Sequence, residues 1–531
     1  MKELRIEELS VKQKLGMVLC EVIRPIEDYE NFDESLEHIL ELIRNHSLGA
    51  VWVIPSNARR EEVMKKIRET ADYPILIVTD AESGLGEHTI GRHNALGVTG
   101  SEELAYIFGK VTAITARKMG YNVVCSPVLD MVKDWRVTSA NIRSLGSDKY
   151  QVTKLATAEA QGLHDGGVLT VGKHYPGGVS KFNVDTHMVE SPSETTKEEL
   201  LDYFLYPYLE LMKKDLLDGI MASHKKLINI DSEYPTSLSK KVIDIIREQG
   251  FDGFSITDAL NMMGIKAKYG DTRAKGLCIA AGNDLILPFC TTGMAYKYLC
   301  DCYDEGIITD ERLDEAVRRV LEAQHKVLSR TPKFTEITQE DIKAFDRINR
   351  DGIYARVDEG FEVPVSQEGK HFFVVLAKNG TDIADDGKVA VDTFSNAWYN
   401  PAGIIEKLEK HFPNSEIRAI YQFPTPAQNM NVFEDSLGYE DVIFITYAEA
   451  PAFVGTDHLT RRIVALINAL QMSGRISTVV HFGNPYVLEE LLHIPRIIIG
   501  GVSGGSINAA LDVLAGDYPA KGVLTYDVNF K

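Results

Sequence analysis

YPILIVTD (73–80), SEELAYIFGKVTAITARKMG (101–120) and YNVVCSPVLD (121–130) follow one another as an apolar run, a helix-like segment and a second apolar run. Nearly every residue of the two runs is apolar. This is typical of parallel strands that are buried on both faces. The stretch therefore predicts a β–α–β unit of a parallel sheet.

The same alternation extends in both directions, from the start of the chain to about residue 326. The remaining apolar runs are LGMVLCEV (15–22), GAVWVIP (49–55), VLTVGKHY (168–175), GIMASHKK (219–226), FDGFSITD (251–258) and GNDLILPF (282–289). Eight β–α repeats predict an α/β fold, a (β/α)8 TIM barrel over residues 1–326. A doubly wound open sheet is the alternative, but no GxGxxG follows the first run.

A second domain follows a polar linking segment. Residues 327–370, including SRTPKFTEITQEDIKAFDRINRDG, are polar and charged and predict a linker with one helix. Four further apolar runs come next: HFFVVLAKN (371–379), DVIFITYAEA (441–450), ISTVVHFGN (476–484) and RIIIGG (496–501). Five or six strands fit within residues 371–531, too few for another barrel, so we predict a smaller α/β sandwich domain there.

Composition narrows the class of protein. The formal net charge is −20, and such a surface repels phosphate backbones and anionic lipid, so we expect neither nucleic acid nor membrane as a partner. The start, MKELRIEELSVKQKLG, is charged and amphipathic, unlike a signal peptide, and no run of about 18 apolar residues exists. The six cysteines are scattered and suit free thiols in a reducing compartment. We expect a cytoplasmic protein without a metal or cofactor, and its oligomeric state stays open.

Polar residues end the apolar runs of the predicted barrel repeatedly. They are Asp80, Glu82, Asp130, Lys173, His174, Ser223, His224 and Asp258. A single one could be a helix N-cap, but lysine and histidine are poor caps. The active site of an α/β barrel lies at the carboxyl ends of its strands. We therefore expect a convergent cluster there, with carboxylates that accept from the hydroxyl groups of a sugar and cations that donate to them.

The loop KHYPGGVSKFNVDTH (173–187) has the most specific local pattern. Lys173 and His174 end a strand, and Pro-Gly-Gly then breaks it. The loop returns with Asp185 and His187, which can form a hydrogen-bonded pair in which the carboxylate orients the imidazole and raises its pKa. A solvated loop with two incidental polar residues is the other interpretation.

These residues resemble a known family. KHYPGGVSKFNVDTH is similar to the KHFPG…DSH signature of glycoside hydrolase family 3, in its N-acetyl-β-glucosaminidase branch. FSITDALNMMGI (254–265) resembles the nucleophile segment of that branch, and TDAESGLGE (79–87) its D-x-E-x-G loop. The further matches, in order and spacing, are SPVLDM (126–131), RSLGSD (143–148), AGNDLILP (281–288) and the VVHFGNPYVL region of the second domain.

The resemblance implies roles for particular residues. Asp258 would be the nucleophile of a retaining glycosidase, and His187, backed by Asp185, its acid/base. The residues that would hold the sugar in the first subsite are Asp80, Arg143, Lys173 and His174. The implied function is a beta-N-acetylhexosaminidase that removes non-reducing terminal β-N-acetylglucosamine through a covalent glycosyl-enzyme intermediate. Such chemistry needs a carboxylate at the anomeric carbon and a second group to move the proton, as these residue types allow.

Two departures from the family pattern leave the exact sugar and aglycone open. The loop from Gly177 to Asp185 is one residue longer than the pattern and lacks its His-Gly-Asp. His88, in SGLGEH, stands where the branch has an arginine.

Three alternative functions remain. A β-glucosidase or β-xylosidase of the same family would take its acid/base from the second domain, where Glu449 ends a predicted strand. A phosphorylase would exploit a histidine base, which carries no negative charge to repel phosphate. An inactive carbohydrate-binding homologue would keep the fold alone, although the Asp258 and Asp185–His187 set argues against it.

Overall fold

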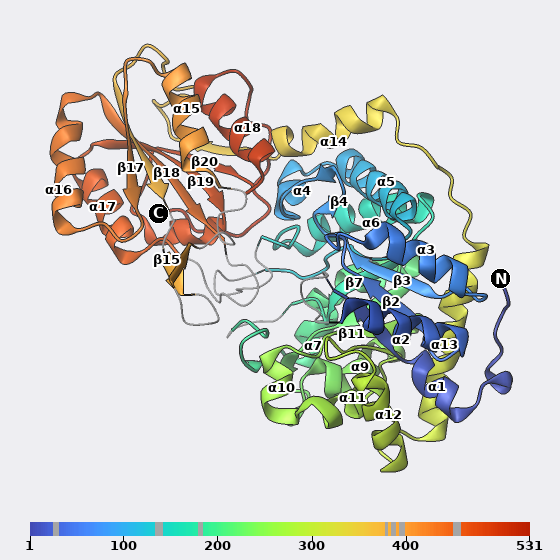
Figure 1. Ribbon diagram of the computed structural model, residues 1–531. Coiled ribbons are helices and arrows are strands. Elements are labelled where there is room, and N and C mark those ends of the chain that lie inside the picture. Colours follow the sequence, from blue (N-terminus) through green and yellow to red (C-terminus); the bar gives the residue numbers. More distant parts are fainter. Residues whose placement is uncertain are drawn as a thin grey trace. The chain divides into compact units, whose positions relative to one another are not determined.

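The structure, a computed structural model, describes residues 1–24, 31–132, 142–178, 184–377, 381–383, 389–391, 399–449 and 458–531 (Figure 1). It divides into two compact units. The barrel unit comprises Met1–Thr89, Glu102–Val132 and Lys149–Phe345. The sheet unit comprises Ile90–Ser101, Lys133–Asp148 and Asp346–Lys531. Residues 90–101 and 133–148 thus precede the predicted linker yet belong to the sheet unit, and the predicted domain limits stay predictions.

The barrel unit contains the predicted (β/α)8 barrel, which is confirmed. Its eight parallel strands form one sheet in chain order. They are β1 (Cys20–Ile23), β2 (Ala50–Val53), β3 (Leu76–Asp80), β6 (Val123–Cys125), β7 (Leu169–Tyr175), β9 (Gly219–Ala222), β11 (Phe254–Ala259) and β12 (Leu285–Leu287). A parallel bridge between Leu19 and Ile286 joins the first strand to the last. Six lie within the apolar runs, and β1 and β11 each extend one residue beyond theirs. The match follows because strands buried on both faces need apolar side chains on both.

Helices follow the strands of the barrel in sequence. They are α1 (Val11–Met17), α2 (Phe32–Arg44), α3 (Arg60–Thr70), α5 (Glu102–Met119), α6 (Lys149–Asp165), α7 (Lys197–Glu199), α8 (Tyr206–Lys213), α9 (Lys240–Glu248), α10 (Met263–Tyr269), α11 (Asp271–Ala280), α12 (Met294–Asp304) and α13 (Asp310–Ser329). Local sequence sets their ends. Ser239 caps α9, its Oγ accepting from the backbone N–H of Val242, and Gly250 follows with φ +90°. Two short pairs complete the unit: β4 (Gly84–Leu85) with β5 (His88–Thr89), and β8 (Ser191–Ser193) with β10 (Lys225–Leu227).

The sheet unit is built on one six-stranded sheet of order β13-β20-β19-β18-β14-β17. Its strands are β13 (Tyr354–Val357), β14 (His371–Ala377), β17 (Glu416–Tyr421), β18 (Asp441–Ala448), β19 (Ile476–Gly483) and β20 (Arg496–Gly500). All neighbours are parallel except β13, which pairs antiparallel with β20. The separate strands β15 (Thr381–Ile383) and β16 (Val389–Val391) pair antiparallel with each other.

Helices cover both faces of this sheet (Figure 1). Alternate residues of β14 divide between two apolar cores: Phe373 and Val375 face one, Phe372 and Val374 the other. The first core includes side chains of α15 (Pro401–His411) and α18 (Gly504–Ala515), the second those of α16 (Pro426–Asp435) and α17 (Arg461–Met472). The unit also contains α4 (Asn94–Thr99), and the chain passes between the units within α14 (Gln339–Asp351). The α/β sandwich is thus confirmed.

Among the described residues, no helix is long and apolar enough to cross a membrane.

Candidate active site

The predicted cluster of the barrel unit is assembled from strand ends. Asp80 ends β3, Lys173 and His174 lie near the end of β7, and Asp258 lies at the end of β11. Because the strands are parallel, these positions share one rim of the barrel.

Lys173 joins two carboxylates on this rim. Its side chain is 1% exposed, and its Nζ lies in ion-pair contact with Asp80 Oδ1 and 3.0 Å from Glu82 Oε2. The Asp80 side chain remains 55% exposed. The two carboxylates therefore fix the position of the ammonium, while the exposed part of the Asp80 side chain can still contact a ligand.

His174 is held by the buried carboxylate of Asp130. Asp130 Oδ2 accepts hydrogen bonds from both the backbone N–H of His174 (3.0 Å) and its Nδ1 (2.6 Å). Lys225 Nζ donates to the other carboxylate oxygen, Oδ1, at 2.8 Å. Burial alone raises the pKa of Asp130, but the charges of Lys225 and His174 outweigh burial and hold that pKa far below its ordinary range. Asp130 is therefore ionised although buried.

The Pro-Gly-Gly break after His174 depends on its glycines. Gly177 and Gly178 have φ values of +93° and +127°. A Cβ on Gly177 would lie 2.4 Å from the carbonyl oxygen of Phe204, and one on Gly178 would lie 2.7 Å from that of Met131. Both glycines are therefore packed so closely against neighbouring backbone that no side chain would fit. Residues 179–183 of the predicted loop lie outside the described residues.

Asp185 and His187 form the predicted pair. Asp185 Oδ1 accepts from the backbone N–H of His187 at 2.9 Å and from its Nδ1 at 2.7 Å. The Asp185 side chain is 2% exposed and that of His187 is 16% exposed. The carboxylate thus fixes the orientation of the imidazole, with Nδ1 turned toward Asp185.

The segment after β11 anchors this loop. The backbone N–H groups of Met263 and Gly264 donate to the carbonyl oxygens of His187 and Thr186, both at 3.0 Å. A Cβ on Gly264 would lie 2.7 Å from Thr186 O, so glycine permits the close approach. The segment that follows the Asp258 strand therefore positions the Asp185–His187 loop.

Asp258 is partly exposed, and its Oδ1 accepts from the backbone N–H of Ala259 at 2.8 Å. Burial raises its pKa, but the nearby histidines His174, His224 and His187, when charged, outweigh burial and leave the pKa below its usual value. The group is thus a carboxylate at neutral pH, the form that a nucleophile needs.

His224 has a structural role beside Asp258. Its Nε2 donates to the carbonyl oxygen of Ala259 at 3.0 Å, and its Nδ1 lies 2.7 Å from Ser237 Oγ. Burial lowers its pKa. His224 therefore ties the end of β9 to the end of β11.

Three other predicted positions, Arg143, Glu449 and His88, are described each within its own unit. Arg143 and Glu449 belong to the sheet unit, where Arg92 Nη2 lies 2.6 Å from Glu449 Oε1 and Tyr447 donates to Oε2 at 2.5 Å. The Glu449 side chain is thus tied into an ion pair within that unit. His88, on β5, packs its ring against Phe345, 5.8 Å away.

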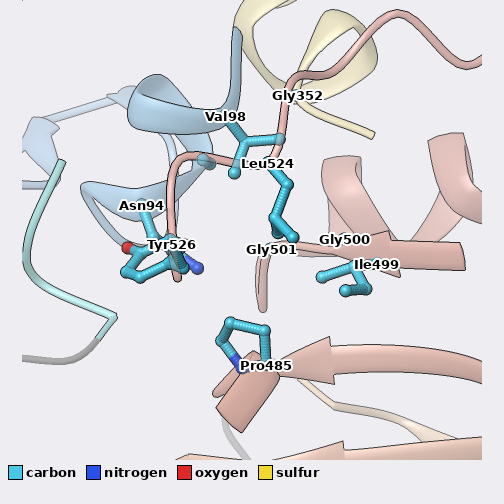
Figure 2. Close-up of a pocket in the computed structure, with 10 residues that line it drawn as sticks. Asn94, Val98, Gly352, Pro485, Ile499, Gly500, Gly501, Leu524 and Tyr526 are labelled. Atoms are coloured by element: carbon cyan, nitrogen blue, oxygen red, sulfur yellow. The ribbon is translucent and has the colours of Figure 1, made fainter. Parts of the chain in front are cut away.

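A pocket of the sheet unit is too small for a sugar. It holds about 10 Å³, room for one water, and Figure 2 shows Val98 and Asn94 there beside Leu524 and Tyr526. The sugar hypothesis therefore rests on the rim of the barrel unit.

Sequence reasoning missed two residues of the cluster, Lys225 and Gly264. Lys225 follows His224 in an apolar run that ends in two lysines, and nothing in that pattern indicates which lysine pairs with Asp130. Gly264 lies within the quoted FSITDALNMMGI motif, but its purpose is visible only through the carbonyl of Thr186.

Curated relatives match part of this chain. A curated relative from Cellulomonas fimi, "Beta-N-acetylglucosaminidase/beta-glucosidase", is 25% identical over 60% of this chain and 57% of its own length. The chain therefore spans little more than half of that relative. A "Beta-hexosaminidase" from Tolumonas auensis is 29% identical over 46% of this chain and 77% of its own length.

A solved glycoside hydrolase family 3 beta-N-acetylglucosaminidase from Paenibacillus sp. str. FPU-7 has the same fold. The TM-score is 0.78 at 22% identity, over 98% of this chain and 100% of that one. The family description "Glycosyl hydrolase family 3 N terminal domain" matches residues 8–323, more than half of the chain. As its motifs predicted, this chain belongs to glycosyl hydrolase family 3.

Proposed function

We propose that the protein is a retaining exo-β-N-acetylglucosaminidase, with Asp258 as nucleophile and His187, oriented by Asp185, as acid/base. The observation that carries the proposal is the Asp185–His187 pair on a loop that hydrogen-bonds to the segment directly after Asp258. This reaction needs a carboxylate nucleophile and a general acid/base. Backbone hydrogen bonds link the segments that carry these two groups.

In the first step, an Asp258 oxygen attacks the anomeric carbon while the bond to the leaving oxygen breaks. Protonated His187 donates its Nε2 proton to that oxygen, and Asp185 stabilises the imidazolium before the transfer. The products are a glycosyl ester on Asp258 and the free aglycone. A carboxylate of lowered pKa is a suitable attacking group because it is deprotonated when the substrate arrives.

In the second step, neutral His187 accepts a proton through Nε2 from water, whose oxygen attacks the anomeric carbon. The ester bond breaks, Asp258 returns as carboxylate, and the configuration is retained overall. Histidine is the side chain that commonly serves as general acid and general base in turn.

The first sugar subsite would be formed by Asp80, Lys173 and His174. Asp80 accepts from sugar hydroxyls, while the buried ammonium of Lys173 holds Asp80 in place. Arg143 stays a proposed member of the subsite on the strength of the RSLGSD motif.

N-acetylglucosamine is the sugar that the sequence and the relatives support. The DTH loop and the TDALNM segment resemble the N-acetylglucosaminidase branch. The two curated relatives above carry the names beta-N-acetylglucosaminidase/beta-glucosidase and beta-hexosaminidase. Cell-wall or chitin-like fragments in the cytoplasm are the proposed source, because the six free cysteines suit a reducing compartment.

The test compares kcat/KM for an aryl N-acetyl-β-glucosaminide with that for the matching aryl β-glucoside. A site that hydrogen-bonds the acetamido group should favour the first by roughly 10²–10⁴-fold. Asp258→Asn protein from the same preparation controls for contaminating glycosidases. A ratio of one or less contradicts the N-acetyl assignment.

The same assay, with and without inorganic phosphate, separates hydrolysis from phosphorolysis. We expect the free sugar as product in both buffers. Formation of the sugar 1-phosphate, detected by ³¹P NMR, would instead assign the phosphorylase function.

A further inference from the structure

Lys225 is a buried cation outside the proposed catalytic set. Its side chain is 5% exposed, and its Nζ lies 2.8 Å from Oδ1 of Asp130, whose side chain is wholly buried. Lysine and aspartate are almost never buried to this degree unless they are paired. The contact therefore needs an explanation beyond packing.

Asp130 is shared between Lys225 and His174. One carboxylate oxygen accepts from the lysine, and the other accepts from Nδ1 and the backbone N–H of His174. The lysine lies on β10 and the histidine on β7, so the carboxylate joins two strands of different sheets.

The charges of this group balance without a proton on the histidine. A buried carboxylate requires one positive charge nearby. Lys225 supplies it, and among the causes that lower the pKa of Asp130 its charge ranks above that of His174. With the carboxylate neutralised by the ammonium, His174 need only donate Nδ1–H, and its Nε2 keeps a lone pair.

We propose that Lys225 is a positioning residue that holds His174 as the neutral Nδ1–H tautomer, so that Nε2 accepts a hydrogen bond from a ligand hydroxyl. That the ligand is a sugar rests on the proposed function. The side chains that interact electrostatically with the Asp130–His174 pair include Lys225 on β10, Asp258 on β11, His224 after β9 and Tyr208 on α8. Asp258 favours a proton on His174, whereas Lys225 and a charged His224 oppose it. Loss of the lysine therefore shifts the balance toward the imidazolium.

The test is an NMR titration of histidines labelled with ¹³Cε1 and ¹⁵N, with the His174 signal assigned through a His174→Gln variant. In the unmodified protein at pH 7, His174 Nε2 should have the ¹⁵N shift of an unprotonated nitrogen. An imidazolium shift at pH 7 overturns the proposal without recourse to any Lys225 variant.

Three variants then isolate the lysine. Lys225→Met should move the titration of His174 upward by roughly 1–3 pH units, and Lys225→Arg, which keeps the charge, should restore it. The double variant Lys225→Met/Asp130→Asn lacks both charges, so the titration midpoint of His174 should be lower than in Lys225→Met alone. An unchanged titration in Lys225→Met, or a double variant as shifted as the single one, contradicts the proposal.

A kinetic readout separates this proposal from the proposed function. At pH 6, Lys225→Met should raise KM for the aryl N-acetylglucosaminide more than it lowers kcat, because a protonated Nε2 cannot accept from a hydroxyl. If the NMR shift occurs and KM is unchanged, the tautomer assignment stands and the contact with sugar is wrong.

Discussion

Two histidine–aspartate pairs of the barrel unit share one local geometry and differ in their surroundings. In both Asp130–His174 and Asp185–His187, one carboxylate oxygen accepts from the backbone N–H and from Nδ1 of the same histidine. The first pair joins residues 44 positions apart and also includes Lys225. The second is closed within three consecutive residues on a loop, and its imidazole is more exposed.

The difference teaches that a shared hydrogen-bond pattern does not by itself assign a role. A carboxylate that is already neutralised by a lysine has less effect in drawing a second proton onto its histidine. The pair with Lys225 therefore suits a binding histidine, and the loop pair suits one that exchanges a proton with substrate and water.

We expect the largest effect from removal of the Asp258 carboxylate, whose pKa the histidines of both pairs lower. Asp258→Asn should lower kcat by about 10⁴-fold, because the amide cannot form the glycosyl ester. Circular dichroism should show an unchanged fold. A 2-fluoro glycosyl inhibitor should label Asp258 in the unmodified protein, and label on another carboxylate would contradict the assignment.

The next experiment compares the two histidines directly. His187→Ala should lower kcat by roughly 10²–10⁴-fold on substrates with poor leaving groups, but little on a dinitrophenyl glycoside, whose departure needs no proton. His174→Ala should lower kcat/KM on both substrates by a similar, smaller factor, on the order of 10–100-fold for a lost hydrogen bond.

The reverse pattern, with selectivity in His174→Ala, would exchange the two roles. A Glu449→Ala variant that reproduces the leaving-group dependence would instead favour an acid from the sheet unit.

A substitution outside the Asp185–His187 pair should displace that pair while leaving both side chains intact. Gly264→Ala places a Cβ against Thr186 O, so the Asp185–His187 loop must shift, and we expect a fall of roughly 10–100-fold in kcat. Gly438→Ala is the matched control, because a Cβ there has no neighbour within 4 Å. Equal activity of the two variants would remove the anchoring role of Gly264.

The smallest effect on activity concerns a third buried carboxylate. Glu21 is 1% exposed, and burial raises its pKa to about 7. The backbone N–H groups of Gly293 and Val22 and the charge of Lys275 lower the pKa and offset the effect of burial only in part. The folded state thus binds a proton that the unfolded state loses above pH 4.5, so stability falls as pH rises from about 4.5 to 7.

Glu21→Gln should remove this loss, a gain of up to about 3 kcal/mol in the free energy of unfolding at pH 8. Thermal melts at pH 5 and pH 8 measure it, with Glu61→Gln, 93% exposed, as control. A variant that loses stability equally at both pH values would contradict the raised pKa.

Sequence alone predicted most of the fold because burial has a clear signature in a parallel sheet. All eight barrel strands coincide with the apolar runs to within one residue, and four strands of the sheet unit lie inside them. In the six-stranded sheet, the strands that gave no such signal are the two at the edges, β13 and β17. Each has one neighbour and exposed residues, and EIRAIY of β17 mixes charges with apolar residues. An edge strand need not be apolar on both faces.

The candidate site was predictable as a set of strand ends, and less so as a network. Asp258, Lys173 and His174 could be named because polar residues stand out after apolar runs. The Lys225–Asp130 contact joins positions 95 residues apart, and no periodicity in the sequence pairs them.

The three-part composition of the sheet unit has a consequence for biosynthesis. The C-terminal segment of the chain, after α18, hydrogen-bonds to the early segments of this unit. The backbone N–H of Val523 donates to Val98 O at 2.7 Å, and the Tyr526 hydroxyl donates to Ser144 O at 2.7 Å. Residues 90–101 and 133–148 are synthesised about 200 residues or more before the rest of that unit begins at Asp346. At about 5–20 residues per second, roughly 10–40 s or more pass before synthesis of that remainder starts. We therefore expect nascent chains halted near residue 345 to recruit chaperones at residues 90–101 and 133–148, and crosslinking on stalled ribosomes would detect it.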